Sequence, residues 1–139
     1  MIVNLLVKGK VEQVEVDDKI VDLVKAMNDS GYETFASCQG HNFPIDVVKP
    51  YIAFKAPTQH VGALEKLLRD DIESIEGKMK WFWCIQGSFN DHYELVYSLS
   101  PHTPCKKRYK YVRKTLDADF KSIIDMLKKI KTNTKPLLE

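Results

Sequence analysis

The chain has 139 residues, of which 44% are apolar and 29% charged, and its formal net charge is +2. This length suits one domain with a core of its own, and the apolar fraction excludes a wholly disordered chain. No apolar run approaches the roughly 20 residues that span a bilayer, and the first residues lack the pattern of a signal peptide. Three cysteines without tight spacing favour reduced thiols. We therefore expect a cytoplasmic protein with no membrane partner.

Positive charge is concentrated at the C-terminal end of the chain. Residues 1–100 carry a net charge of −5, whereas residues 101–139 carry a net charge of +7. Phosphates respond to clustered positive charge rather than to the charge of a whole chain. The C-terminal part is therefore the predicted face for a polyanionic partner.

In chain order, the sequence first predicts a β-hairpin and a helix. Residues 2–8 and 11–16 are rich in β-branched and apolar residues, and Gly9 supplies the positive φ of the turn. Asp17 then opens a helix whose apolar residues recur three and four positions apart, and Gly31 ends it.

Two short strands then flank an irregular loop that carries two prolines. The strands cover residues 32–37 and 51–55, and the loop covers residues 41–50. A second helix follows, with Thr58 as its N-cap and a buried stripe that ends near residue 74.

The C-terminal part contains the strongest strand predictions, over residues 78–89 and 92–100, joined by a two-residue turn. A last helix begins near Thr115 or Asp117 and ends in a polar tail from about Thr132. Together the elements predict one α+β domain over residues 1–131 and a polar tail over residues 132–139. Strands and helices do not alternate strictly, which favours a two-layer sandwich with one mixed, mostly antiparallel sheet and about three helices.

Reactive side chains gather at the turn after the third predicted strand. Cys38 and His41 are separated by two residues, and His102 and Cys105 repeat this spacing after the last predicted strand. Two thiolates and two imidazoles form the ligand set of a tetrahedral structural zinc. One prediction is a zinc site at these four residues, and the alternative is unrelated surface histidines and half-buried cysteines.

Cys38 is also a candidate catalytic nucleophile, with His41 as its base. A nucleophilic thiol needs a nearby cation or a helix N-terminus, and no helix is predicted to begin at Gly40. Asp46 and Asp91 are the candidates to orient the imidazole. The alternative is that Gly40 supplies a positive φ and Cys38 is packed.

The basic segment, residues 106–114, contains six cations and two tyrosines. This mixture suits phosphate neutralisation combined with base stacking, above all on single strands. The alternative is a solvated basic face or a strand edge protected by lysines. The candidate ligand-binding cations of this segment are Lys106, Lys107, Arg108, Lys110 and Arg113.

Trp81 and Trp83 are a candidate stacking platform for bases. With a two-residue turn between the last two strands, Cys84 faces Tyr97 and both indoles share a face with polar neighbours. The alternative is that a helix, such as the C-terminal one, covers this face, because exposed aromatic patches are rare in monomers.

Residues 31–41, with the sequence GYETFASCQGH, follow a predicted helix and precede a short hydrophobic strand. This arrangement resembles small bacterial and phage proteins of unassigned function that carry a Ser-Cys-x-Gly-His turn. More distantly, residues 37–40 are similar to the Ser-Cys-Ser-Gly-Arg turn of the wybutosine-synthesising tRNA methyltransferase family, although His41 stands where that family has Arg. The resemblance implies a turn that faces a ligand through Ser37, Cys38, Gly40 and His41.

The sequence thus predicts a small protein that binds nucleic acid or another phosphate-bearing ligand. The basic segment supplies charge, and the turn at residues 37–41 shapes a pocket. Two alternatives stay open. One is a nucleic-acid-modifying or hydrolytic enzyme that uses Cys38 and His41, with or without zinc. The other is a phage or bacterial regulator that binds a protein through the basic segment, Trp81 and Trp83.

Overall fold

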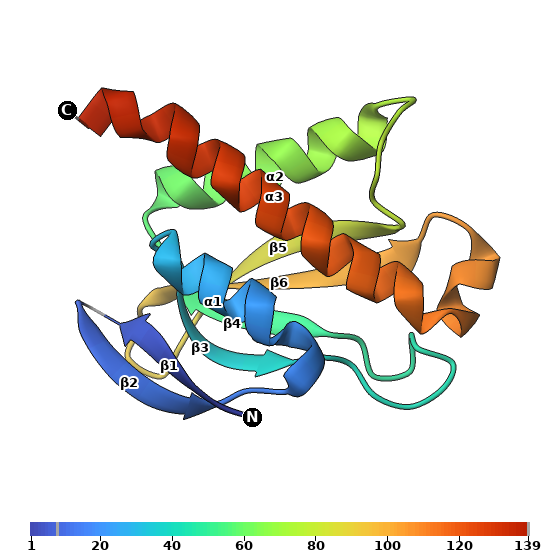
Figure 1. Cartoon of the computed structure of the whole chain (residues 1–139), viewed down its shortest axis with the longest axis horizontal. Helices are drawn as coiled ribbons and strands as arrows, with labels where there is room; N and C mark the ends of the chain where they lie inside the picture. The colour runs from blue at the N-terminus through green and yellow to red at the C-terminus, as the bar shows by residue number, and fades with distance from the viewer. Residues whose placement is uncertain (8, 139) are drawn as a thin grey trace.

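The computed structural model describes residues 1–7 and 9–138, with side chains as far as Lys131. The described residues form six strands and three α-helices (Figure 1): β1 (Ile2–Val7), β2 (Lys10–Glu15), α1 (Val21–Asp29), β3 (Glu33–Cys38), β4 (Tyr51–Lys55), α2 (Thr58–Glu73), β5 (Trp81–Phe89), β6 (Leu95–Pro104) and α3 (Arg113–Leu138). Two short 3-10 helices, η1 (Asp18–Ile20) and η2 (Lys107–Tyr111), precede α1 and α3. The predicted α+β class is confirmed.

The strands form two antiparallel sheets where the sequence predicted one. β1 and β2 pair only with each other, and the other four strands form a sheet in the order β3-β4-β6-β5. β1 lies against α1, and its alternate residues Val3 and Leu5 are buried. The hairpin therefore joins the core through side chains on one face rather than through backbone hydrogen bonds to β3.

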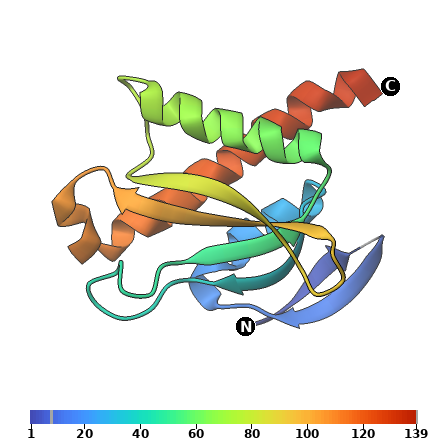
Figure 2. The same ribbon diagram turned by 180° about the vertical axis from the view of Figure 1, so that it is seen from behind.

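The helices form a layer on one face of the four-stranded sheet. α1 and α3 cross in front of the strands in Figure 1, and α2 packs beside α3 against β5. In the opposite view the strands lie in front of α1 and α3 (Figure 2). The core between the layers includes the fully buried side chains Tyr32, Ile52, Phe54, Leu64, Trp81, Leu99 and Ile123.

The connection between β5 and β6 is longer than the predicted two-residue turn. Phe89 pairs with Leu95, and Cys84 faces Ser100 rather than Tyr97. The Asn90 side-chain oxygen accepts hydrogen bonds from the backbone N–H groups of His92 and Glu94, which stabilises the wider loop. The predicted register is therefore wrong by three residues, and an odd shift exchanges the two faces of β6 relative to β5.

This register buries both tryptophans. Trp81 is 0% exposed and Trp83 is 7% exposed. The Trp83 ring packs edge-on against Phe120 of α3, and the Trp81 indole N–H donates to Thr115 Oγ1 at 2.9 Å. The predicted stacking platform is therefore wrong, and the alternative that the C-terminal helix covers this face is confirmed.

Two helix ends differ from the sequence predictions. Pro57 occupies the N-cap position of α2 and Thr58 is its first residue, so Thr58 makes no side-chain capping bond. α3 continues to Leu138 instead of ending near Thr132. Because the side chains after Lys131 lie outside the described ones, the division into a domain and a polar tail stays a prediction. No helix in the described part of the chain is long and apolar enough to cross a membrane.

Candidate functional site

The Cys38 turn, residues 37–41, ends β3 through a left-handed backbone conformation. Gly40 has a φ of +86°, and a Cβ atom there would lie 3.0 Å from Pro50 Cδ and 3.1 Å from the Val48 carbonyl oxygen. The His41 N–H donates to that same carbonyl at 2.9 Å. Both the torsion and the close approach require glycine, so the predicted positive-φ role of Gly40 is confirmed.

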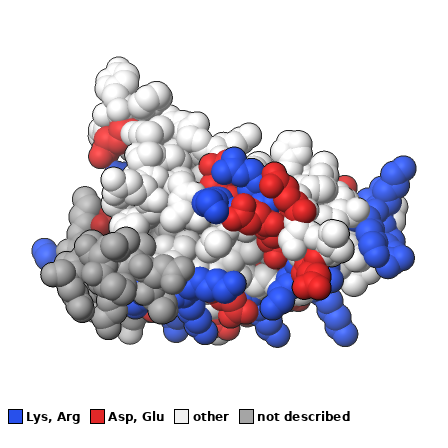
Figure 3. Space-filling view, turned by 90° about the horizontal axis from the view of Figure 1, so that it is seen from above, with Lys and Arg blue, Asp and Glu red and all other residues white. Residues whose placement is uncertain are grey.

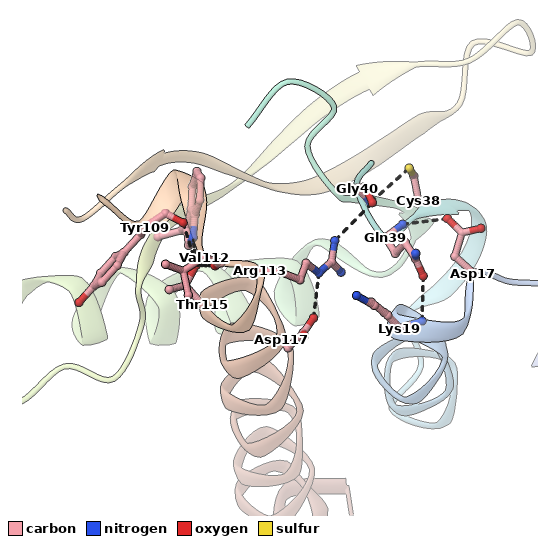
Figure 4. A network of polar contacts seen from close by, with 11 residues as sticks. Asp17, Lys19, Cys38, Gln39, Gly40, Tyr109, Val112, Arg113, Thr115 and Asp117 are labelled. Carbon is pink, nitrogen blue, oxygen red and sulfur yellow. Dashed lines mark hydrogen bonds and ion pairs between the residues drawn. The ribbon is translucent and has the colours of Figure 1, made fainter. Parts of the chain in front are cut away.

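Asp17, which directly precedes η1, joins this turn. Its Oδ2 accepts a hydrogen bond from the Gln39 N–H at 3.0 Å and lies 3.5 Å from His41 Nε2. The Gln39 side chain in turn accepts a bond from the Lys19 N–H at 2.9 Å. Figure 4 shows the two hydrogen bonds of Gln39 together with the 3.4 Å bond from the Gly40 N–H to Cys38 Sγ. The start of the first helical segment therefore holds the end of β3.

Asp17, Cys38 and His41 offer an oxygen, a sulfur and a nitrogen atom that all lie within 4.8 Å of one another. In the part of the chain that the structure describes, no other three His, Cys, Asp or Glu residues come this close. Asp17 and Cys38 are half-buried, whereas the His41 side chain is 51% exposed. The cluster therefore rests on two half-buried side chains, and its imidazole is accessible to solvent.

The sequence did not predict Asp17 as the partner of His41. The candidates that we took from the sequence were Asp46 and Asp91. Asp17 was assigned only as the acidic start of a helix. The two residues are 24 positions apart, and they meet because η1 packs against the end of β3. No spacing signal in the sequence indicates this contact.

His102 and Cys105 do not join the cluster, so the predicted four-residue zinc site is wrong in two of its ligands. β3 and β6 run in the same direction, but β4 lies between them, and two strand spacings amount to about 10 Å. Cys105 also lies beside the start of β5, because its N–H donates to the carbonyl of Lys80 at 2.8 Å. The two Cys-His pairs are therefore too far apart to share one ion.

Ser37 is also separated from the cluster. It pairs with Ile52 in the β3-β4 ladder, whereas Cys38 pairs with Tyr51. Successive side chains of a strand point to opposite faces, and Ile52 is buried in the core. Ser37 therefore faces the helix layer, and Cys38 faces the other way.

The basic segment lies directly beside the Cys38 turn. Arg113 Nη1 donates to the Gly40 carbonyl at 3.3 Å, as Figure 4 shows. The Ile45 N–H, in the loop that follows the turn, donates to the Lys110 carbonyl at 2.8 Å. Two regions about 70 residues apart in the sequence thus form one surface.

Most cations of the basic segment lack an acidic partner. Arg113 pairs with Asp117 at 3.0 Å, but within the described residues five others make no ion pair with a carboxylate: Lys106, Lys107, Arg108, Lys110 and Lys114. Figure 3 shows Lys and Arg side chains projecting at the right-hand end of the molecule, where Figure 1 places η2. This end therefore retains uncompensated positive charge.

Two exposed aromatic rings accompany these cations. Phe43 and Tyr111 are 68% and 52% exposed, and their ring centroids lie 5.7 Å apart. Lys110 Nζ lies 5.2 Å from the centre of the Tyr111 ring. The sequence pointed to the tryptophans for stacking, and it missed Phe43 because the loop that carries this residue has no periodic pattern.

Comparison of the chain with protein-family models, curated proteins and solved structures found no match. The resemblance of the Cys38 turn to a methyltransferase turn therefore stays a prediction. Function is inferred from the site: a solvent-accessible cluster of three donor atoms beside a basic surface with exposed aromatic rings.

Proposed function

We propose that the protein binds a phosphate-bearing ligand and that single-stranded nucleic acid suits its surface best. The observation that carries the proposal is the contact between the basic segment and the Cys38 turn, in which Arg113 donates to the Gly40 carbonyl. This contact places unpaired cations around a loop with exposed aromatic rings. A phosphodiester chain can therefore be neutralised while its bases contact the rings.

Arg113 supports the proposal by fixing the basic segment against the Cys38 turn. Nε and Nη1 bond to Asp117 and to the Gly40 carbonyl, but Nη2 is buried and has no hydrogen-bond partner in the described part of the chain. A buried donor without a partner is uncommon in proteins. Because this buried atom is out of reach of a ligand, Arg113 serves to position the basic segment rather than to bond a phosphate.

The aromatic rings favour a single strand over a duplex. Phe43 and Tyr111 are exposed and tilted by 49° to each other, so both rings are accessible to the bases of a single strand. Stacking of a base on an aromatic ring contributes about 1–3 kcal/mol. Paired bases in a duplex are not accessible to such stacking.

The test is fluorescence anisotropy with a labelled single-stranded RNA of mixed sequence, measured at several salt concentrations. The test variant replaces Lys106, Lys107, Arg108 and Lys110 with Gln. The control variant removes the same charge from α1, α2 and the following loop, at Lys25, Lys66, Arg69 and Lys78. We expect the test variant to bind at least about tenfold more weakly and its log–log salt slope to flatten by about 3, since each phosphate contact on a single strand contributes about 0.7. Equal weakening in the control variant, or no binding at low salt by the wild type, contradicts the proposal.

An enzyme that modifies or hydrolyses nucleic acid is the second candidate, and Asp17 is the observation that favours it. A carboxylate 3.5 Å from His41 Nε2 supplies the group that orients a catalytic imidazole. Incubation of labelled RNA with wild type and with Cys38→Ala tests this candidate. Product from the wild type alone supports it, and unchanged RNA in both reactions leaves binding as the function.

A further inference from the structure

We propose that Asp17, Cys38 and His41 form a site for one transition-metal ion, with Zn²⁺ as the ion that suits it best and with the fourth position open to water or an anionic oxygen. The site goes beyond the proposed ligand binding because it is defined by its own three side chains. Metal binding is also measured without nucleic acid.

The donor set selects the class of metal. A thiolate, an imidazole nitrogen and a carboxylate oxygen suit Zn²⁺, whereas Ca²⁺ and Mg²⁺ prefer sites built from oxygen donors alone. The three donors come from Asp17, Cys38 and His41, and all lie within 4.8 Å of one another. A borderline-soft ion is therefore the expected occupant.

The distances fit a tetrahedral ion. Zinc bonds of about 2.0–2.1 Å to nitrogen and oxygen imply that two such donors lie about 3.4 Å apart in a tetrahedron. The observed separation of His41 Nε2 from Asp17 Oδ2 is 3.5 Å. The Cys38 sulfur lies within 4.8 Å of both, so a movement of about 1.2 Å at most brings it to the roughly 3.6 Å that a zinc-bound thiolate requires.

The geometry favours an ion over a catalytic triad. In a triad, the nucleophile and the carboxylate contact different nitrogens of the imidazole. Here one nitrogen of His41 lies within 4.8 Å of both the Cys38 sulfur and the Asp17 carboxylate. Three donor atoms this close to one another suit the coordination of one ion.

Backbone contacts hold two of the ligands in place. The Gly40 N–H donates to Cys38 Sγ, and the Gln39 N–H donates to Asp17 Oδ2. Hydrogen bonds to ligand atoms hold them in the orientation that an ion requires. Because Gly40 also accepts the bond from Arg113, the open position lies beside the basic segment, where an anionic oxygen is attracted.

The test is a titration of the untagged, chelator-treated full chain with Zn²⁺ and, separately, with Co²⁺. We expect one equivalent of either metal and a thiolate-to-cobalt charge-transfer absorption. Cys38→Ser removes this absorption and weakens zinc binding by at least about 100-fold. Mutation of a residue that only hydrogen-bonds to a metal ligand already lowers metal affinity by about 10- to 100-fold. Asp17→Asn and His41→Gln weaken zinc binding in the same direction.

The matched controls are Cys84→Ser, Cys105→Ser and His102→Gln, which remove the same residue types elsewhere. These variants keep the absorption and the affinity within about twofold if the assignment is correct. Less than half an equivalent of zinc in the wild type, or an absorption that survives Cys38→Ser, overturns it. Circular dichroism of each variant separates loss of a ligand from loss of the fold, and Cys38→Ser, a change of one atom, keeps the test valid if Asp17→Asn unfolds.

Discussion

Two aspartates show how the same side chain serves two different purposes in this molecule. Asp119 of α3 is fully buried, and its carboxylate accepts hydrogen bonds from the N–H groups of Lys80 and Trp81 and from the Trp83 indole, at 2.7–3.0 Å. Asp17 is partly exposed and accepts one backbone hydrogen bond. Both carboxylate oxygens of Asp119 accept hydrogen bonds inside the protein, whereas the carboxylate of Asp17 is accessible to a ligand.

The buried aspartate also explains how the basic segment is positioned. Asp119 fastens α3 to the start of β5, and Thr115 links the same helix to Trp81. The Thr115 hydroxyl in turn donates to the Val112 carbonyl at 2.7 Å. A closed polar cluster thus holds the helix whose first residue, Arg113, contacts the Cys38 turn.

Asp119→Ala is expected to have the largest effect on the free energy of unfolding. This change leaves two buried N–H donors and one partly buried N–H donor without an acceptor, and we expect it to lower the free energy of unfolding by about 3–5 kcal/mol. Asp17→Ala, at the open cluster, lowers it by about 1 kcal/mol or less. Urea denaturation of both variants measures the difference, and equal losses contradict the contrast between the two aspartates.

The second prediction concerns pH. Burial raises the pKa of Asp119 to about 6, and hydrogen bonds from Lys80, Trp83 and Trp81 oppose this rise. Because the folded pKa exceeds the unfolded value of 3.8, this group contributes stability that is present at low pH and is lost as the pH rises through about 6. Between pH 7 and pH 4, the wild type gains about 2 kcal/mol from it.

Asp119→Asn is the control for this pH dependence, because asparagine does not titrate. The stability difference between wild type and Asp119→Asn should widen as the pH falls from 7 to 4, as urea denaturation at each pH measures. A difference that stays constant or narrows over this range shows that Asp119 does not take up a proton in the folded state.

A smaller effect is expected at the Cys38 turn. Gly40→Ala introduces a Cβ atom 3.0 Å from Pro50 Cδ at a φ of +86°, and we expect a loss of about 2 kcal/mol. Gly31→Ala is the matched control, because its φ is +90° but no atom lies within 4 Å of the added Cβ. That change costs about 1 kcal/mol. Thermal denaturation that ranks Gly31→Ala as the more harmful change contradicts the close approach at Gly40.

The smallest effect is expected for Arg113→Lys. Lysine retains the charge but loses the fork that bonds to Asp117 and to the Gly40 carbonyl at once. We expect RNA affinity to fall by about two- to fivefold with little change in the salt slope, as anisotropy measures. A loss as large as that of the quadruple variant would mean that Arg113 alone carries the binding.

The sequence predicted features that depend on neighbouring residues. The apolar spacing of α1, its end at Gly31 and the positive φ of Gly40 are local properties of the chain, and the structure has all three. The register of β5 and β6 was wrong because it depends on the hydrogen bonds of Asn90 within a longer loop. With that register the sequence placed both tryptophans beside polar neighbours and left two alternatives, a stacking platform or coverage by the C-terminal helix, of which the structure has the second.

The candidate site was predicted only in part, for the same reason. Cys38 and His41 are neighbours in the chain, so their spacing revealed them. Asp17 meets them only after η1 packs against β3, and β4 separates them from His102 and Cys105. Contacts between distant segments are set by packing, and no short motif encodes them.

The most direct test of the central claim is ultraviolet crosslinking of a uridine-rich single-stranded RNA to the full chain, with the crosslinked peptides identified by mass spectrometry. The claim is that the basic segment and the loop after the Cys38 turn form one binding surface. We predict crosslinks on peptides that contain Phe43 and on peptides from residues 106–114, and their loss in the variant with four neutralised cations. Crosslinks confined to other elements, or none at low salt, would contradict it.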